Sequence, residues 1–363
     1  MNRLFPVILL FAVTGLVACV DEITLGDPDV PDSGILVQGR FIPGTPGMVE
    51  AEVLELYALS NNQPKAIGGA KVVLHDDQGH TLDLISNFDG TYTRSVDRDD
   101  PLFPAATGRQ YRLIVSLPNG QVYESAWETL LAPAPADSLH AEIVEREYLN
   151  ADDIPVLRPT LSISLDAGLT VPGSQDRAHL RWEIDQGFKL TDLPELPAYI
   201  NNPPKTCYVV RKLLAETLHI FDGAGIPADH LYRYPLVETA IDSRFSEGFY
   251  LLVYQQTIGA NAYGYFEELN QLLDRKGTQF DPPAGSIRSN ISSPTHPEIP
   301  VYGFFYAAQE DTLRIYTSPD AAGNPDRYCP LPPPFNPRIH PTPCDDCLIE
   351  GGAQLDKPSW WTE

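Results

Sequence analysis

Short segments in which apolar and polar residues alternate dominate the first third of the chain. Five of them are Ala70–Leu74, Thr81–Ile85, Thr91–Val96, Gln110–Leu117 and Gln121–Trp127, and turns of sequence DDQG, NFDG and PNG lie in three of the four gaps between them. A period of two is typical of strands with one buried face, and Asn-Gly or Asp-Gly pairs are typical of hairpin turns. Residues 35–60 mix periods, and we predict strands there too. About six short strands within about 110 residues predict a β-sandwich of immunoglobulin or transthyretin type over residues 35–146.

The pattern changes after the proline-rich stretch LAPAP at residues 131–135. Apolar or alternating runs predict further strands at Thr160–Leu165, His179–Ile184, Phe249–Gln256, Val301–Ala307 and Thr312–Thr317. Asn261–Lys276 is the one clear helix, because Tyr263, Phe266, Leu269, Leu272 and Leu273 recur with a period near 3.6 and Gly277 follows. We therefore predict a second β-rich domain with one amphipathic helix over residues 147–328, followed by a Cys- and Pro-rich tail, residues 329–363, packed on that domain.

The composition agrees with a folded β protein and limits its partners. Apolar residues make up 43% of the chain and aromatic residues 10%, which excludes a wholly disordered protein. The formal net charge of −24 repels phosphate backbones, so we predict no nucleic-acid partner. Beyond the N-terminal segment, no apolar run approaches the ~20 residues that span a bilayer.

The N-terminal segment has the layout of an export signal. Arg3 precedes an apolar run from Leu4 to Val13, and the segment closes on Leu16-Val17-Ala18-Cys19. This ending resembles the lipobox of bacterial lipoproteins, in which the cysteine is acylated and becomes the first mature residue. We predict a signal peptide over residues 1–18, lipidation of Cys19, and attachment to a membrane through that residue. The acidic residues 19–34 predict a flexible tether. An ordinary signal peptide with an incidental cysteine is the alternative.

Four further cysteines are candidates for disulfides: Cys207, Cys329, Cys344 and Cys347. An even number in an exported protein predicts a disulfide framework, although three connectivities remain open. A bond from Cys207 into the tail would tie the C-terminal segment to the sheet of the second domain. The competing interpretations are a zinc site built with His340 and a redox CxxC pair. We predict disulfides, with no metal and no cofactor.

Other motifs that resemble functional sites are weak. Gly223-Ala-Gly225 superficially matches a dinucleotide fingerprint, but Pro227 opposes the required helix, so we predict a hairpin turn. The acidic turn at residues 97–100 lacks the spacing of a calcium loop. HExxH, GxSxG and SxxK are absent from the sequence, and we predict no catalytic residue. Trp360 and Trp361 are predicted to pack on a sheet, with a sugar-binding surface as the alternative.

From about Ala240 the order of motifs resembles a known family. The stretches FYLLVYQQTIGANAYGYFEELNQLL, FDPPAGSIRSNI, VYGFFYAA and CDDCLIEGGAQLDKPSWW are together similar to the domain-of-unknown-function 4249 lipoproteins of Bacteroidota, over roughly residues 19–363. The resemblance implies an exported lipoprotein, often found beside a TonB-dependent outer-membrane receptor. Asp21 and Glu22, directly after Cys19, resemble the signal for display on the outer face. The family implies no activity.

We therefore expect a non-enzymatic outer-membrane lipoprotein, lipid-anchored and exposed at the cell surface. It is predicted to be an accessory or ligand-capture subunit of a TonB-dependent receptor, with a small molecule or glycan of unspecified identity as its ligand. Two alternatives stay open at this point: a surface hydrolase or metal-dependent enzyme, and an adhesin or structural surface module.

Overall fold

The computed structural model describes residues 33–57, 64–174, 176–193, 203–213, 217–274, 287–297, 299–330 and 342–362. Within these ranges the protein is mainly β, with a single α-helix, α3 (Ala260–Leu273), which confirms the predicted fold class. The predicted signal peptide, Cys19 and most of the predicted tether lie outside the described residues. None of the helices in the described part has the length and apolar character that crossing a membrane requires.

The first sandwich contains the strands predicted from the turn-separated segments. Its first sheet has the order β19-β1-β2-β7-β6, and in this sheet β20 also pairs with β1 and β3 with β2. Its second sheet has the order β18-β9-β8-β4-β5, and in this sheet β10 also pairs with β8. The bounds are β1 (Ser33–Ile42), β2 (Gly47–Tyr57), β3 (Lys65–Ala66), β4 (Lys71–Asp76), β5 (Thr81–Asp83), β6 (Ile85–Ser86), β7 (Thr91–Val96), β8 (Gln110–Ser116), β9 (Val122–Ser125), β10 (Glu128–Thr129), β18 (Ile291–Ser292), β19 (Val301–Tyr302) and β20 (Phe305–Ala307). Alternation on β8 buries Tyr111, Leu113 and Val115 between the two sheets, as the period of two predicts.

Three strands of the first sandwich come from far along the chain. β19 and β20 both pair in parallel with β1, and β18 pairs with β9. Gly303, between β19 and β20, has a φ of +96°, and a Cβ there would lie 2.2 Å from the carbonyl oxygen of Val37. Only glycine fits this close approach. We call residues 287–308 the return segment, because they bring the chain back to the first sandwich.

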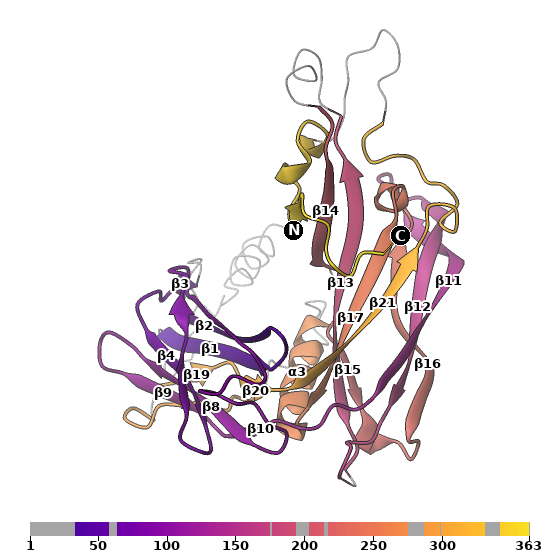
Figure 1. The fold of residues 1–363 in the computed structure, drawn as a ribbon. Helices are drawn as coiled ribbons and strands as arrows, with labels where there is room; N and C mark the ends of the chain where they lie inside the picture. Colours follow the sequence, from indigo (N-terminus) through magenta and orange to yellow (C-terminus); the bar gives the residue numbers. More distant parts are fainter. Residues whose placement is uncertain are drawn as a thin grey trace, which may run out of the picture.

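The second sandwich stands beside the first and is built from longer strands (Figure 1). One sheet has the order β11-β12-β16, and the other has the order β21-β17-β13-β14-β22, with β15 also beside β13. The bounds are β11 (Ala136–Leu149), β12 (Pro155–Gly168), β13 (His179–Thr191), β14 (Thr206–Lys212), β15 (His219–Asp222), β16 (His230–Ala240), β17 (Phe249–Ile258), β21 (Gln309–Thr317) and β22 (Ala353–Gln354). Leu165, Leu180, Phe188 and Leu251 are fully buried in the core between these sheets.

This arrangement differs from the predicted division of the chain at residue 146. β11 pairs with β12 along its length and belongs to the second sandwich, although residues 136–146 were predicted to lie in the first domain. Residues 291–307, predicted within the second domain, complete the first. The physical reason is that alternation identifies a strand and its buried face, whereas its partner strand depends on contacts far apart in sequence.

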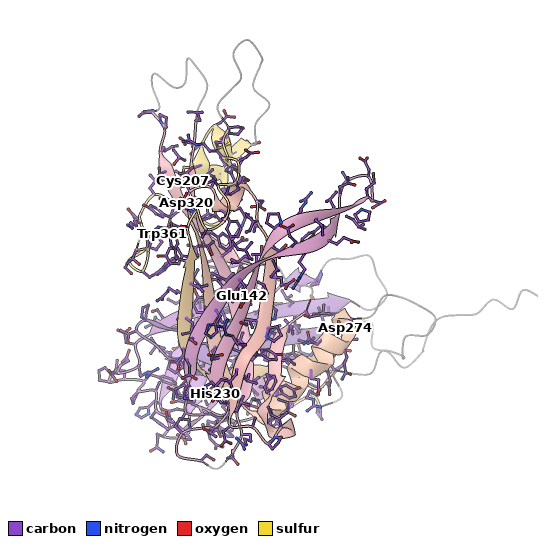
Figure 2. All side chains as sticks on the ribbon, turned by 90° about the vertical axis from the view of Figure 1, so that its right-hand side faces the viewer. Glu142, Cys207, His230, Asp274, Asp320 and Trp361 are labelled. Carbon is purple, nitrogen blue, oxygen red and sulfur yellow. A yellow bond between two sulfur atoms is a disulfide. The ribbon has the colours of Figure 1, made fainter. Side chains whose placement is uncertain are left out.

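The described part of the predicted tail packs on the second sandwich. Disulfides join Cys207 on β14 to Cys347, and Cys329 to Cys344. These bonds confirm the disulfide prediction and use the thiols that a zinc or redox site would need; His340 lies outside the described residues. Two short 3-10 helices, Thr342–Cys344 and Cys347–Ile349, carry Cys344 and Cys347. Cys207 and Trp361 lie toward the same end of this sandwich (Figure 2).

Helix α3 lies at the junction of the two sandwiches (Figure 1). Its buried face comprises Ala262, Tyr265 and Phe266, which pack with Phe304 and Tyr306 of the return segment. The predicted apolar face is therefore partly wrong: Phe266 is buried, but Leu273 is 55% exposed in the last turn. Ala262 is fully buried, and a search for large apolar residues overlooks so small a side chain.

Candidate functional site

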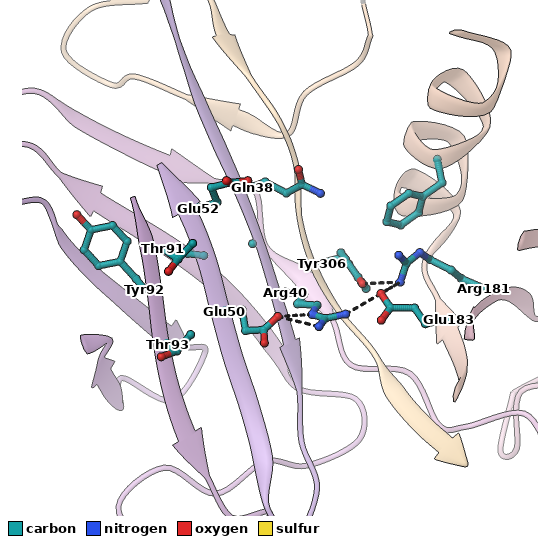
Figure 3. A pocket seen from close by; sticks show the side chains of 13 residues that line it. Gln38, Arg40, Glu50, Glu52, Thr91, Tyr92, Thr93, Arg181, Glu183 and Tyr306 are labelled. Carbon is teal, nitrogen blue, oxygen red and sulfur yellow. Dashed lines mark hydrogen bonds and ion pairs between the residues drawn. The ribbon is translucent and has the colours of Figure 1, made fainter. Parts of the chain in front are cut away.

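Two adjoining cavities open at the junction of the sandwiches. The first, of about 450 Å³, lies between β1, β2 and β7 of the first sandwich and β13 and α3 of the second (Figure 3). The other, of about 550 Å³, lies between residues 42–48 and strands β13, β14, β17 and β21. Both are lined by Arg40 and Glu183. We call the two cavities together the junction cleft.

Arg40 bridges the two sandwiches across this cleft. Its guanidinium Nη2 lies 2.7 Å from Oε2 of Glu50, and its Nη1 donates to Oε1 of Glu183 at 2.7 Å. Arg40 and Glu50 are directly opposite on the antiparallel pair β1–β2, so their side chains share a face. Glu183 comes from β13 of the other sandwich. Figure 3 shows Arg40 reaching between the two carboxylates.

Arg181 gathers a second set of partners on the same face of β13. Its Nη1 donates to Glu183 at 2.7 Å, to Oε1 of Gln256 at 2.8 Å and to the hydroxyl of Tyr306 at 3.0 Å. Its guanidinium carbon lies 4.5 Å from the centre of the Phe266 ring, a cation–π contact with α3. Arg181 therefore connects β13, β17, β20 and α3 at one point.

The charges at the centre of the cleft stabilise one another. Burial alone would raise the pKa of the Glu183 carboxyl, but Arg181 and Arg40 outweigh burial and hold that pKa well below its usual value. Burial opposes the charge on Arg40 as well, and Glu183, Tyr306 and Glu50 outweigh it, so the pKa of Arg40 is raised. The Arg40–Glu183 pair consequently stays ionised across the physiological pH range.

The second cavity contains two carboxyl groups, those of Asp185 and Glu310, whose burial is offset by fewer partners than that of Glu183. Burial raises the pKa of Asp185 and the pKa of Glu310. Oδ1 of Asp185 is buried and accepts no hydrogen bond from the described residues, and the ammonium of Lys212 lies 3.8 Å away. Glu310 accepts one bond, from the amide of Gln256 at 2.9 Å. Burial and nearby carboxylates also raise the pKa of Tyr254 to about 12. This cavity is therefore suited to a ligand that offers hydrogen-bond donors or a positive charge.

The first cavity differs from the second in its walls. The hydroxyl-bearing side chains of Thr91 and Thr93, with Gln38 and Glu52, lie along the first sandwich, and Phe266 lies opposite. Donors, acceptors and an aromatic ring thus surround a volume within the ~300–1,000 Å³ typical of small-molecule sites. The arrangement can bind a polar organic molecule between the sandwiches.

The motifs noted in the sequence lie elsewhere. Residues 223–225 form a 3-10 turn capped by Asp222, which confirms a turn, but the turn connects β15 and β16 in different sheets and is not a hairpin. In the acidic turn, Asp100 caps the N–H of Leu102 at 2.8 Å. Trp361 is 2% exposed and packs with Tyr208 and Tyr250, which confirms the predicted packing on a sheet.

Sequence reasoning missed the residues that form the cleft. Arg181 and Glu183 alternate with Leu180, Trp182 and Ile184, the pattern of an ordinary strand with one solvent-facing side. A period of two shows which residues share a face but not whether a second domain covers it. The available signal was a run of charged side chains, Arg181, Glu183 and Asp185, on one face of a long strand.

Comparisons with known proteins place the chain in a family. No curated protein matches it. Among solved structures, it is similar to trypsin-activated alpha-2-macroglobulin from Escherichia coli, at 12% identity over 65% of this chain and 16% of that one, with a TM-score of 0.18. It is also similar to a putative carbohydrate binding protein from Bacteroides uniformis ATCC 8492, at 12% identity over 64% of this chain and 92% of that one, with a TM-score of 0.12. Neither likeness is close enough to support an argument.

The match to a sequence family is more extensive. Residues 22–314 match the model of a family described as Domain of unknown function (DUF4249). The matched range contains the first sandwich, the junction cleft, α3 and the return segment. The chain therefore belongs to the DUF4249 family.

Proposed function

We propose that this protein is a non-enzymatic, lipid-anchored protein of the bacterial outer-membrane surface that captures a ligand and delivers it to a TonB-dependent receptor. The observation that carries the proposal is the junction cleft, whose walls come from both sandwiches and whose volume suits a small molecule. Arg40 and Arg181 fix these walls in position without a ligand. A preformed site of this kind avoids the cost of ordering its side chains on binding.

Sequence features support the location in this proposal. The segment Leu16–Cys19 and the acidic residues Asp21 and Glu22 support lipidation and display on the outer face. The two disulfides support an oxidising compartment outside the cytoplasm. Attachment then depends on the acyl chains of Cys19, and two or more chains give stable anchoring.

Affinity purification tests the partnership. Full-length tagged protein, extracted in detergent from its native membrane after chemical crosslinking, is expected to bring a large β-barrel receptor in near-equal amount. The Cys19→Ser variant is expected to lose both its acyl chains and its partner. Isolation of the acylated protein alone, in several detergents and after crosslinking, would contradict the proposal.

A variant that fills the cleft tests capture. Thr93→Trp places an indole in the first cavity, and Ser95→Trp places one on the same strand and face but outside the residues that line it. Native mass spectrometry of protein purified from cells is expected to show a small-molecule adduct on wild type and Ser95→Trp, and none on Thr93→Trp. An adduct that survives in Thr93→Trp would place the ligand elsewhere.

One observation favours a surface hydrolase as a second candidate. The second cavity is lined both by Glu183, whose pKa is lowered, and by Glu310, whose pKa burial raises. Carboxyls whose pKa values diverge are a common arrangement for general acid–base chemistry. Hydrolysis of chromogenic glycosides or esters that is abolished by Glu310→Gln, with receptor binding intact, would favour this function. A wild-type protein inactive on all of them would remove its support.

A further inference from the structure

Another cavity, of about 520 Å³, lies at the start of α3 and is separate from the junction cleft. Its walls include Trp127 and Glu128 at β10, Asp176 and Arg177 in the approach to β13, and Gly259 and Asn261 at the start of α3. None of these residues lines either cavity of the junction cleft. We call this cavity the α3 pocket.

Glu128 is an unusual side chain in the wall of the α3 pocket. The residue is only 7% exposed, and its Oε1 accepts a hydrogen bond from the amide of Asn290 at 3.0 Å. Its Oε2 accepts no hydrogen bond from the described residues and lies 3.6 Å from where a Cβ on Gly259 would stand, beside the first turn of α3. Oε2 is not fully enclosed, so it can accept a hydrogen bond from a molecule in the α3 pocket. Burial of the residue raises the pKa of Glu128 to about 7.

The first turn of α3 offers hydrogen-bond donors beside this acceptor. Gly259 is the N-cap and supplies no side-chain hydrogen bond to the helix. The first N–H groups of a helix have no partner within the helix itself, so they are donors for another molecule. The side-chain amide of Asn261 adds both a donor and an acceptor. Acceptors and donors therefore lie next to each other at one end of the α3 pocket.

The charged groups in the wall of the α3 pocket limit which class of molecule can bind there. The carboxylates of Glu128 and Asp176 disfavour an anion, and the positive end of the α3 dipole disfavours a cation. Two basic residues lie in the wall: Arg177 is already paired with Asp229 and with the carbonyl of Pro227, and Nδ1 of His179 lies 3.2 Å from Oδ1 of Asp222. A neutral molecule that both donates and accepts hydrogen bonds satisfies these constraints.

Trp127 supplies an apolar surface in the same wall. Its side chain is 39% exposed, and the guanidinium of Arg112 lies 4.7 Å from the ring centre, which holds the indole in place. A sugar ring has a hydroxyl-rich edge and a face of C–H groups, so it can bond to Glu128 and α3 while its face packs on an indole. We propose that the α3 pocket binds a neutral carbohydrate of one or two sugar units. The site is additional to the junction cleft, and the proposal does not depend on the receptor partnership.

Titration with defined sugars tests the proposal. The full-length protein is held in a detergent without a sugar headgroup, and neutral, acidic and amino mono- and disaccharides are added up to 20 mM. Saturation-transfer NMR and isothermal titration measure binding. At least one neutral sugar is expected to saturate the protein. Trp127→Ala is expected to weaken its binding at least tenfold and Glu128→Gln about fivefold to tenfold, because an amide oxygen is a weaker acceptor than a carboxylate.

Ser95→Trp, which lies outside the residues that line the α3 pocket and the junction cleft, is the matched control and should bind the same sugar unchanged. Circular dichroism and the melting temperature of each variant separate lost binding from lost folding, and the isosteric Glu128→Gln should keep the wild-type fold. Three results would overturn the proposal: no neutral sugar that saturates, binding of charged sugars only, or affinity unchanged in both Trp127→Ala and Glu128→Gln.

Discussion

The two sandwiches are completed in different ways. In the first, β1 is flanked by the parallel strands β19 and β20 of the return segment, and Phe305 and Ala307 of β20 pack in the apolar core. In the second, the strands are long and largely consecutive. One disulfide fastens the tail to β14, and the other, Cys329–Cys344, closes a loop within the tail. The return segment also lies between Cys207 and Cys347 in sequence, inside the loop that their bond closes.

This difference shows that the first sandwich needs strands from the second half of the chain to complete its core. The strands β18, β19 and β20, which complete the first core, follow α3 in sequence and precede β21, and α3 and β21 both belong to the second half. Phe304 and Phe305 alternate between the two sides of the return segment: Phe304 packs on α3, and Phe305 packs in the first core. The sandwiches therefore form one structural unit, and the junction cleft between them is preformed.

Removing the long-range disulfide should have the largest effect. The Cys207→Ser/Cys347→Ser double variant opens a loop with a sequence separation of 140, and Cys329→Ser/Cys344→Ser opens one of 15. The entropy of loop closure predicts losses of about 5 and about 3 kcal/mol in the free energy of unfolding, respectively. Equilibrium denaturation of both double variants measures the difference. A larger loss from the short loop would argue against the long-range restraint.

Removing a buried side chain of the return segment should have the second-largest effect on stability. Phe305→Ala removes a fully buried ring from the first core and should cost about 4 kcal/mol. Hydrogen exchange should then show faster exchange throughout β1, β2 and β8, beyond the site of the change. Tyr302→Ala, in the same segment but 41% exposed, is the control and should cost about 1 kcal/mol or less. Faster exchange confined to residues 301–307 would contradict the dependence of the first sandwich on the return segment.

The buried carboxyl of Glu128 should make the free energy of unfolding depend on pH. Its pKa is raised by burial to about 7 from 4.5, so between these values the unfolded chain is ionised while the folded protein keeps the proton. The free energy of unfolding therefore falls as the pH rises through this window, by up to about 3 kcal/mol. Glu128→Gln should match wild type at pH 4 and be more stable at pH 8. Parallel stability profiles for the two proteins would contradict the burial of this group.

Breaking the bridge across the cleft should have the smallest effect. Arg40→Met leaves Glu183 paired with Arg181 and Lys212, so the expected loss is about 2 kcal/mol rather than that of an isolated buried pair. A double-mutant cycle of Arg40→Met with Glu183→Gln, followed by denaturation, measures the coupling energy across the cleft. A coupling energy near zero would mean that Arg40 does not hold the sandwiches together.

Much of the fold was predictable from local patterns. Alternation in Gln110–Leu117 and the Asn119-Gly120 turn predicted β8, β9 and their hairpin, and the 3.6 period predicted α3. An even number of cysteines predicted disulfides but not which residues pair. The parallel pairing of β1 with the return segment could not be predicted, because local periodicity carries no information about distant partners.

The candidate site was less predictable than the fold. Glu183 and Arg181 occupy outward positions of β13, where charged residues are ordinary, and only the placement of the first sandwich turns that face into a cleft wall. Glu128 follows Trp127 at the end of a hairpin, and its burial depends on α3 and Asn290. Sites assembled between domains leave little local trace in the sequence.

Dependence of the first sandwich on the return segment can be measured directly by fragment complementation. Residues 33–135 are produced alone, and a synthetic peptide of residues 287–308 is then added. Circular dichroism and two-dimensional NMR should show that the fragment alone has no cooperative thermal transition, and that the peptide restores a cooperative transition and dispersed amide signals. A fragment that folds cooperatively without the peptide, with spectra unchanged on its addition, would contradict the account.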